Sequence, residues 1–206
     1  MSPIIGVVLS YLAGSIPSAY IAGRVRGVDL RKHGSGNLGA TNVVRVLGPR
    51  IGGVVFVADL LKGFLPVFLI APHTVSTMLP AEVWALVYGA AAILGHVKPI
   101  FLLGKGGGKG VATASGVFLA LALVPMLVAE VVWIAVFYFT RYVSLASLAG
   151  AAVLPAAIIA WYGEPRSPVF IASLIIAAFV FWTHRTNIGR LRRGEEHRFV
   201  KKESAT

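Results

Sequence analysis

Residues 111–140 read VATASGVFLALALVPMLVAEVVWIAVFYFT, with Glu130 as the only charged side chain and Pro125 near the middle. A membrane-spanning helix needs about 20 apolar residues, and roughly 17 is the lower limit. The stretch is too long for one such helix and short for two. We therefore predict a close pair of membrane helices, 111–124 and 126–140, rather than one helix kinked at the proline.

Apolar stretches of similar quality fill most of the remaining chain. The 206 residues are 57% hydrophobic and only 13% charged, whereas about 25% of the residues of a soluble domain are charged. We predict an all-α, polytopic membrane protein with seven transmembrane helices. It forms a single integral-membrane domain over residues 1–206 with a basic cytoplasmic tail at 185–206. Besides the pair above, the predicted spans are 3–23, 51–71, 80–103, 143–162 and 167–184.

The placement of Lys and Arg decides between six and seven spans. Cytoplasmic loops of membrane proteins are enriched in these residues. With seven spans and the N-terminus outside, the outer loops at 72–79 and 124–127 contain no Lys or Arg. Six spans would place Arg141 and the basic tail on opposite sides. We therefore predict the N-terminus outside and the C-terminus inside, with the basic residues of 24–50, 98–109, 141 and 185–202 in the cytoplasm.

The net charge of +11 limits the class of partner. Basic residues lie between or beside apolar spans, which favours anionic lipid headgroups and anionic substrates over nucleic acid. The chain has no cysteine, which excludes disulfides, thiolate metal ligands and a cysteine nucleophile. We expect no metal, no cofactor and no nucleic acid.

The run GSGNLGATN at residues 34–42, followed by Arg45, is the first candidate site. A dinucleotide fold would need a strand before the glycines, and none is expected here. A helix opening near Asn37 or Ala40 would instead present backbone N–H groups to an anion. The alternative is a glycine loop that only packs tightly, but packing would not require so many polar side chains. The candidate binding residues are Ser35, Gly36, Asn37, Thr41, Asn42 and Arg45.

A second run, GKGGGKG, occupies residues 104–110. It is not a Walker A loop, because Leu103 and Gly110 stand where that motif needs a glycine and a hydroxyl residue. Glycines and lysines ahead of a helix that begins near Val111 can still hold an anion. Two ordinary interfacial lysines explain the run equally well. The candidates are Lys105, Gly107, Gly108 and Lys109.

Other polar residues lie within or at the ends of the spans. Asp59 and Lys62 stand three residues apart on one helix face, as a mutually satisfied structural pair or as part of a site. His184 and Asn187 share a face at the end of the last span, where a histidine beside an amide suits proton transfer or orientation. Arg141 and Ser144 have a similar spacing. We expect these clusters and both glycine runs on the cytoplasmic face.

Together these motifs resemble the bacterial acyl-phosphate:glycerol-3-phosphate acyltransferases. The likeness follows the chain in order through 34–45, 59–63, 95–96, 107–113, 140–144 and 184–187. One departure is an additional residue between Phe101 and Val111. No His-x-x-x-x-Asp pattern follows any histidine, which argues against the acyltransferases that use acyl thioesters.

The resemblance implies a multi-pass enzyme of the bacterial inner membrane whose active site faces the cytoplasm. Such an enzyme transfers a fatty acyl group from acyl phosphate to the 1-hydroxyl of sn-glycerol 3-phosphate. The products are lysophosphatidic acid and inorganic phosphate, in the first acylation of phospholipid synthesis. Its partners are the two substrates and membrane lipids, and we expect a monomer.

Residue roles follow as a hypothesis. Ser35, Gly36 and Asn37 hold the phosphoryl group of acyl phosphate while Lys109 neutralises the leaving phosphate. Arg45, helped by Arg141 or Lys105, anchors glycerol 3-phosphate. His184 and Asn187 position its hydroxyl or accept the proton, unless a phosphate oxygen of the donor accepts it instead. A transporter of phosphorylated metabolites and a lipid-binding scaffold are the other classes considered, although a transporter places its site near the membrane midplane.

Overall fold

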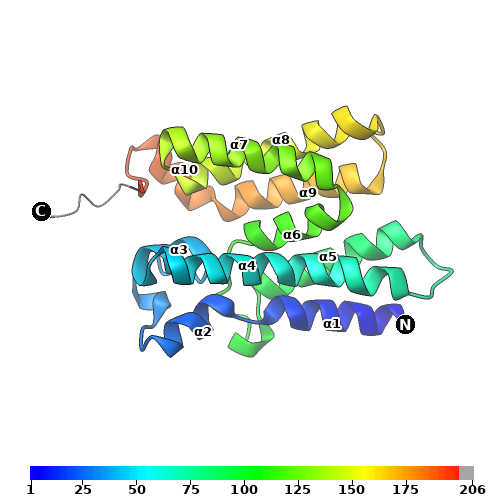
Figure 1. The fold of residues 1–206 in the computed structure, drawn as a ribbon, viewed down its shortest axis with the longest axis horizontal. Helices are drawn as coiled ribbons and strands as arrows, with labels where there is room; N and C mark the ends of the chain where they lie inside the picture. Colours follow the sequence, from blue (N-terminus) through cyan, green and yellow to red (C-terminus); the bar gives the residue numbers. More distant parts are fainter. Residues whose placement is uncertain (200–206) are drawn as a thin grey trace, which may run out of the picture. The chain divides into compact units, whose positions relative to one another are not determined.

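The computed structural model describes residues 1–199, and these form helices joined by loops, with no strand in that range (Figure 1). Contacts within the chain define two compact units, Met1–Leu123 and Val124–Thr206, called here the N-terminal and C-terminal units. The all-α prediction is confirmed. A single domain over residues 1–206 stays a prediction, and the end of the predicted tail at 200–206 lies outside the described residues.

The N-terminal unit begins with two helices where one was expected. α1 (Pro3–Ser15) and α2 (Ser18–Val25) are separate helices (Figure 1), and the break lies at Ile16 and Pro17. Together they form one candidate span over Pro3–Val25, close to the predicted 3–23. Proline has no N–H to continue the helical hydrogen bonds, and its ring disfavours a helical residue before it. Ile16 has an extended ψ of 114°. The first span is therefore a broken helix.

Two longer helices follow in the same unit. The turn η1 (Leu30–Lys32) leads to α3 (Ala40–Leu47), and then α4 (Pro49–Leu65) is extended by η2 (Pro66–Ile70) and η3 (Ala71–His73). α5 (Ala81–Val97) ends before the turn η4 (Ile100–Leu102), and α6 (Val111–Leu121) completes the unit. The predictions of helix starts near Ala40 and Val111 are confirmed.

Glycines bring these helices into backbone contact. A Cβ on Gly14 of α1 would collide with the carbonyl of Ala92 on α5. A Cβ on Gly63 of α4 would likewise collide with the carbonyl of Thr113 on α6. Helices that pack in lipid gain van der Waals contact from such close approach, because the lipid supplies no hydrophobic driving force between them. Substitution at either glycine would force the helices apart.

The apolar stretch 111–140 is divided into two helices, as predicted, but the break lies at Ala122 rather than at Pro125. α7 (Leu123–Thr140) begins two residues before the proline. A proline in the first helical turn costs little because the N–H groups there have no intrahelical partner. α6 has eleven residues and extends about 16 Å at 1.5 Å per residue. It is too short to cross a hydrocarbon core of about 30 Å alone.

The C-terminal unit contains α7, α8 (Val143–Tyr162), α9 (Pro168–Thr183) and α10 (Arg185–Arg192). Trp133 of α7 donates a hydrogen bond to the hydroxyl of Ser147 on α8 across 3.2 Å. Ser167 caps α9 by accepting from the N–H of Phe170. α9 and α10 meet at a bend of 59°.

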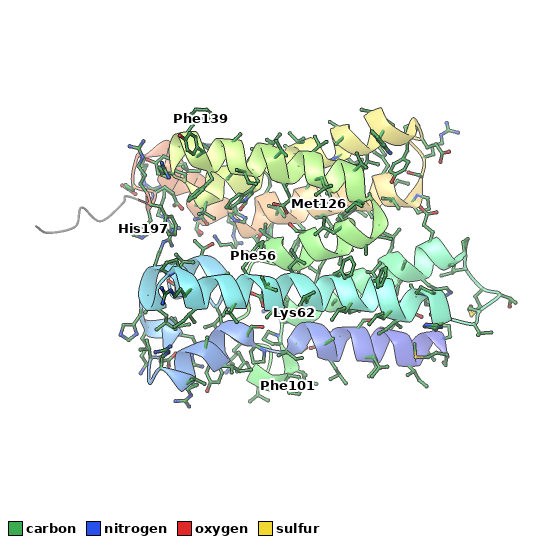
Figure 2. The ribbon with its side chains drawn as sticks, viewed as in Figure 1. Phe56, Lys62, Phe101, Met126, Phe139 and His197 are labelled. Carbon is green, nitrogen blue, oxygen red and sulfur yellow. The ribbon has the colours of Figure 1, made fainter. Side chains whose placement is uncertain are left out.

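Five helical segments of residues 1–199 are long and apolar enough to cross a membrane, and the bent pair α9–α10 makes a sixth. Large apolar side chains are exposed along them, such as Val54, Phe68 and Val131. Phe56 and Phe139 are further examples, labelled in Figure 2. Side chains of this kind suit contact with lipid tails. The structure therefore supports a multi-pass membrane protein, while seven spans and their orientation stay predictions.

Candidate active site

The first glycine run forms a loop held by a single side chain. Asn42, in the first turn of α3, accepts a 2.8 Å hydrogen bond from the N–H of Ser35 through Oδ1. Its Nδ2 donates to the carbonyls of Leu30 at 3.2 Å and His33 at 3.1 Å. Only 1% of Asn42 is exposed. Its amide therefore fixes the conformation of the loop from inside.

Two glycines of this loop adopt a backbone conformation that other residues avoid. Gly34 has a φ of 61° and Gly36 a φ of 70°, both in the left-handed region that costs an L-residue roughly 1 kcal/mol or more. Ser35 between them is exposed, and Asn37 is half-buried. The turn therefore presents Ser35 outward while Asn42 holds its backbone.

α3 carries the remaining candidates of the first run. Gly39 precedes the helix, and Thr41 and Arg45 stand one turn apart on one face, both half-buried. The positive end of the helix dipole lies at the same end as the loop. A hydroxyl, a guanidinium and the positive end of a helix together suit a phosphate.

The second glycine run lies on the end of α5. Val97 and His96 carbonyls leave no room for a Cβ on Gly107, and the imidazole Nε2 of His96 leaves none on Gly108. The N–H of Gly108 also donates to the carbonyl of His96 at 3.3 Å. Lys105 is exposed and Lys109 half-buried. This loop is thus seated directly on His96.

The two glycine runs meet within the N-terminal unit. A Cβ on Gly106 would lie 3.4 Å from Cδ1 of Leu38 and 3.5 Å from Cδ of Arg31. Leu38 is buried in a cluster with Leu30 and Val43, against which Leu102 packs. Arg31 is held by Asp29, whose oxygens lie 2.9 Å from its Nε and its terminal nitrogen. The structure therefore brings together the two loops that the sequence singled out as anion sites.

His184 occupies the bend between α9 and α10. Its Nδ1 lies 2.8 Å from the carbonyl of Val180, which can only accept a hydrogen bond. In the neutral imidazole Nδ1 then carries the proton and Nε2 is the basic nitrogen. The residue is 4% exposed. A fixed tautomer of this kind suits a proton acceptor.

Glu196 accepts hydrogen bonds from three polar residues of the C-terminal unit, although no sequence motif singled it out. Its Oε1 accepts from Ser144 at 2.9 Å and from Asn187 at 2.7 Å. Its Oε2 accepts from Nε of Arg190 at 2.7 Å. A carboxylate two residues after a glycine in an otherwise basic segment was the available signal.

The pKa of Glu196 reflects these contacts. Burial acts to raise it, but the hydrogen bonds from Arg190, Asn187 and Ser144 outweigh burial and lower it below 4.5. Glu196 is therefore ionised at neutral pH. It connects the start of α8 to α10, so Ser144 and Asn187, predicted as separate candidates, belong to one cluster.

Arg141 lies at the corner between α7 and α8. It has a φ of 62°, and its carbonyl accepts the N–H of Phe199 at 3.0 Å. Its guanidinium lies over the ring of Tyr138, 5.4 Å from the centroid. The side chain of Arg141 is exposed, while its backbone is held by the hydrogen bond from Phe199.

The candidate residues thus form two sets. The N-terminal unit holds paired glycine loops with Lys105, Lys109 and Arg45, and the C-terminal unit holds His184 with the Glu196 cluster. The first set has the donors and charge of a phosphate-binding surface. The second has a base of fixed tautomer.

A family model described as glycerol-3-phosphate acyltransferase matches residues 4–194. The chain belongs to the glycerol-3-phosphate acyltransferase family. Among curated relatives, the glycerol-3-phosphate acyltransferase of Geotalea daltonii is 47% identical over 206 residues, covering 97% of this chain and 99% of its own. That of Aquifex aeolicus is 44% identical over 195 residues, covering 94% and 97%.

Solved structures agree with this membership. PlsY (YgiH), an integral membrane glycerol 3-phosphate acyltransferase, has a crystal structure in its glycerol 3-phosphate form. That structure is 39% identical to this member of the family, with a TM-score of 0.87 and 96% of each chain covered. Its lysophosphatidic acid form is 37% identical, with a TM-score of 0.84 and 96% and 95% covered. The family resemblance stated from the motifs is confirmed.

Proposed function

We propose that this protein transfers a fatty acyl group from acyl phosphate to the 1-hydroxyl of sn-glycerol 3-phosphate. The observation that carries the proposal is the contact between the two glycine loops, Gly106 against Leu38, in a member of this acyltransferase family. Both substrates carry a phosphate group, and the two adjoining loops carry the Ser35 hydroxyl and the cations Lys105 and Lys109, with Arg45 on the helix that follows the first loop. The forms in which PlsY was solved, with glycerol 3-phosphate and with lysophosphatidic acid, fit the acceptor and the product.

The proposed reaction needs no enzyme nucleophile. The 1-hydroxyl oxygen attacks the acyl carbon, the bond between that carbon and the phosphate oxygen breaks, and inorganic phosphate leaves with the bonding electrons. An acyl phosphate is a mixed anhydride with a good leaving group. Orientation and charge stabilisation are therefore the main tasks of the protein.

Phosphate binding is assigned to the N-terminal unit. Ser35, Gly36 and Asn37 hold the phosphoryl group of the donor, and Lys109 neutralises the charge that develops on the leaving phosphate. Arg45 and Thr41 bind from α3, while Asn42 contributes by holding the loop. Gly107 and Gly108 allow close approach of the backbone in the second loop, where Lys105 adds charge.

Proton transfer and acceptor orientation are assigned to the C-terminal unit. Nε2 of His184 accepts the hydroxyl proton, since Nδ1 faces the carbonyl of Val180. Asn187 and Ser144 orient the acceptor while Glu196 holds both. Arg141 assists with the acceptor's phosphate.

We further propose seven spans, with the N-terminus outside and the C-terminus inside, in a bacterial inner-membrane monomer. In this topology α6 is the fourth crossing, although the helix alone is shorter than the hydrocarbon core. Its contacts with α4 at Gly63 and Gly116 let the longer helix cover it. This topology puts both glycine loops and His184 on the cytoplasmic side, where glycerol 3-phosphate is dissolved. The acyl chain of the donor remains in the lipid.

The direct test supplies purified protein with palmitoyl phosphate and glycerol 3-phosphate and measures inorganic phosphate and lysophosphatidic acid. The proposal expects both products in equal amounts, and only when both substrates and the protein are present. Acyl-CoA and acyl-carrier protein serve as alternative donors. Product formed from either of these but not from acyl phosphate would contradict the assigned donor. Uptake of glycerol 3-phosphate into sealed vesicles without product would indicate a transporter.

A further inference from the structure

Three ionisable side chains are buried together inside the N-terminal unit. Asp59 and Lys62 of α4 and His96 of α5 are 2%, 7% and 6% exposed. Nζ of Lys62 lies 2.8 Å from Oδ1 of Asp59, and Nδ1 of His96 lies 3.7 Å from the same oxygen. The mutually satisfied pair considered from the sequence is thus formed, with His96 beside it.

Lys62 also reaches the break in the first span. Its Nζ donates to the carbonyl of Ile16 at 3.0 Å, between α1 and α2. Figure 2 shows Lys62 between α4 and these two helices. Pro17 interrupts the helical hydrogen bonds here, so the ammonium helps to satisfy a carbonyl exposed by the break. The cluster therefore ties α4 to α1 and α2.

His96 connects the cluster to the second glycine loop. Its Nδ1 side faces Asp59, while its Nε2 side touches Gly108 so closely that no Cβ fits between them. Its carbonyl accepts the N–H of Gly108. The ring of His96 therefore lies between the Asp59 carboxylate and the loop at Gly108.

We propose that Asp59 and His96 are positioning residues for the phosphate-binding loop 104–110. Asp59 fixes the imidazole, and the imidazole supports Gly108, so that the loop holds Lys109 where it meets a phosphate group of the substrate. This inference deepens the proposed function and rests on it. Neither Asp59 nor His96 touches the reacting atoms.

A purely structural role explains the cluster less well. Two charges removed from water are a weak source of stability, and an apolar pair of similar volume often serves equally well. A charged pair does impose direction, because the carboxylate must face both the ammonium and the ring. Displacement of a binding group by about 1 Å can reduce a rate by roughly 100-fold. The geometry thus suits control of loop position.

The test compares His96→Ala and Asp59→Asn with the wild-type enzyme. His96→Ala leaves the Asp59–Lys62 pair intact and removes the support beneath Gly108. Asp59→Asn leaves Lys62 as an uncompensated buried charge, so the charge-balanced double variant D59N/K62M is measured beside it. His73→Ala and Glu82→Gln, which alter exposed residues of the same unit, are the matched controls.

The expected result is a KM for one phosphorylated substrate raised roughly 10- to 100-fold, with the other KM changed about threefold or less. The value of kcat falls as well, because the displaced loop carries Lys109. The affinity for inorganic phosphate, measured by titration calorimetry, falls in parallel. The inference would be overturned if both KM values were unchanged in His96→Ala and in the double variant. A lower kcat or a lower yield of folded protein would then mark the cluster as purely structural. The calorimetric measurement does not depend on turnover. If the wild-type protein binds inorganic phosphate in the calorimeter but forms no phosphate from the two substrates, the proposed reaction is contradicted. The loop assignment is then still supported if phosphate affinity falls in the variants.

Discussion

The side-chain amide of Asn187 donates a 2.7 Å hydrogen bond to Oε1 of Glu196, which also accepts the hydroxyl of Ser144. The two donors come from different helices, α10 and α8. Glu196 is 7% exposed, whereas its neighbour Glu195 is paired with Arg193 at the surface. One carboxylate thus holds Ser144 and Asn187, the two residues proposed to orient glycerol 3-phosphate, in fixed positions relative to each other.

Replacing Glu196 should therefore destabilise the C-terminal unit. Glu196→Ala removes the shared acceptor and leaves buried donors without partners, and we expect a loss of about 3 kcal/mol in the free energy of unfolding. Glu195→Ala breaks only an exposed ion pair and should cost about 0.5 kcal/mol or less. Thermal unfolding of the two variants in detergent measures the difference. Equal stability of both would contradict the cluster.

The lowered pKa of Glu196 predicts a dependence on pH. A carboxyl whose pKa is lower in the folded protein contributes stability above its unfolded pKa, and loses this contribution as pH falls through the folded value. Stability should therefore be flat above pH 4.5 with respect to this group and decline below it. The measurement is the unfolding temperature against pH for wild type and Glu196→Gln. An equally steep acid decline in the variant would assign the effect to other groups.

Asn42 should control the first glycine loop. Asn42→Ala removes three hydrogen bonds, to Ser35, Leu30 and His33, at a cost of about 2–3 kcal/mol. We expect activity to fall at least roughly tenfold, because the Ser35 backbone loses its anchor. Lys32→Ala is the control, since it alters an exposed side chain of the same segment. Wild-type kinetics in Asn42→Ala would show that the loop needs no such support.

Sequence patterns predicted the elements that depend on local apolar runs. α8 and α9 begin and end within a residue of the predictions at 143–162 and 167–184, and α3 and α6 begin near the expected positions. The break at Ile16 and Pro17 was missed although the proline was visible. A lone proline in an apolar run is compatible with a continuous kinked helix, and the carbonyl at the break is satisfied by Lys62, 46 residues away.

Side-chain partners across elements were harder to predict. The spacing of Asp59 and Lys62 indicated their ion pair, because i and i+3 positions face each other on one helix. No sequence spacing indicated that His96 lies beside this pair. None indicated that Glu196 accepts a hydrogen bond from Ser144, 52 residues away. Substrate binding by Asn42 stays a prediction, and nothing local indicated that its amide holds the loop through Ser35, Leu30 and His33. Such contacts depend on tertiary packing rather than on sequence spacing.

His184 is the proposed proton acceptor, with its tautomer set by the carbonyl of Val180. His184→Ala should lower kcat by about 10²–10⁴-fold, the range typical of a lost general base. The measurement is steady-state phosphate release with both substrates saturating. A loss of only a few-fold would indicate that a phosphate oxygen of the donor accepts the proton.

Lys109 and Lys98 are a matched pair for mutagenesis, because both lysines lie in the segment between α5 and α6. Lys109→Met removes charge from the second glycine loop and should lower kcat roughly 10²-fold, as for loss of a group that stabilises developing charge. Lys98→Met alters an exposed lysine whose backbone carbonyl, not its side chain, accepts from Tyr11. It should leave kcat within about twofold. Similar losses in both variants would reduce Lys109 to an interfacial lysine.

The central claim is that both glycine loops and the His184 bend act from the cytoplasmic side of the membrane. The chain contains no cysteine, so Ser35→Cys, Thr186→Cys and Thr77→Cys can each be labelled without background. In sealed inside-out vesicles, an impermeant maleimide should label positions 35 and 186 and spare position 77. Labelling of 35 and 186 from opposite sides would contradict the account.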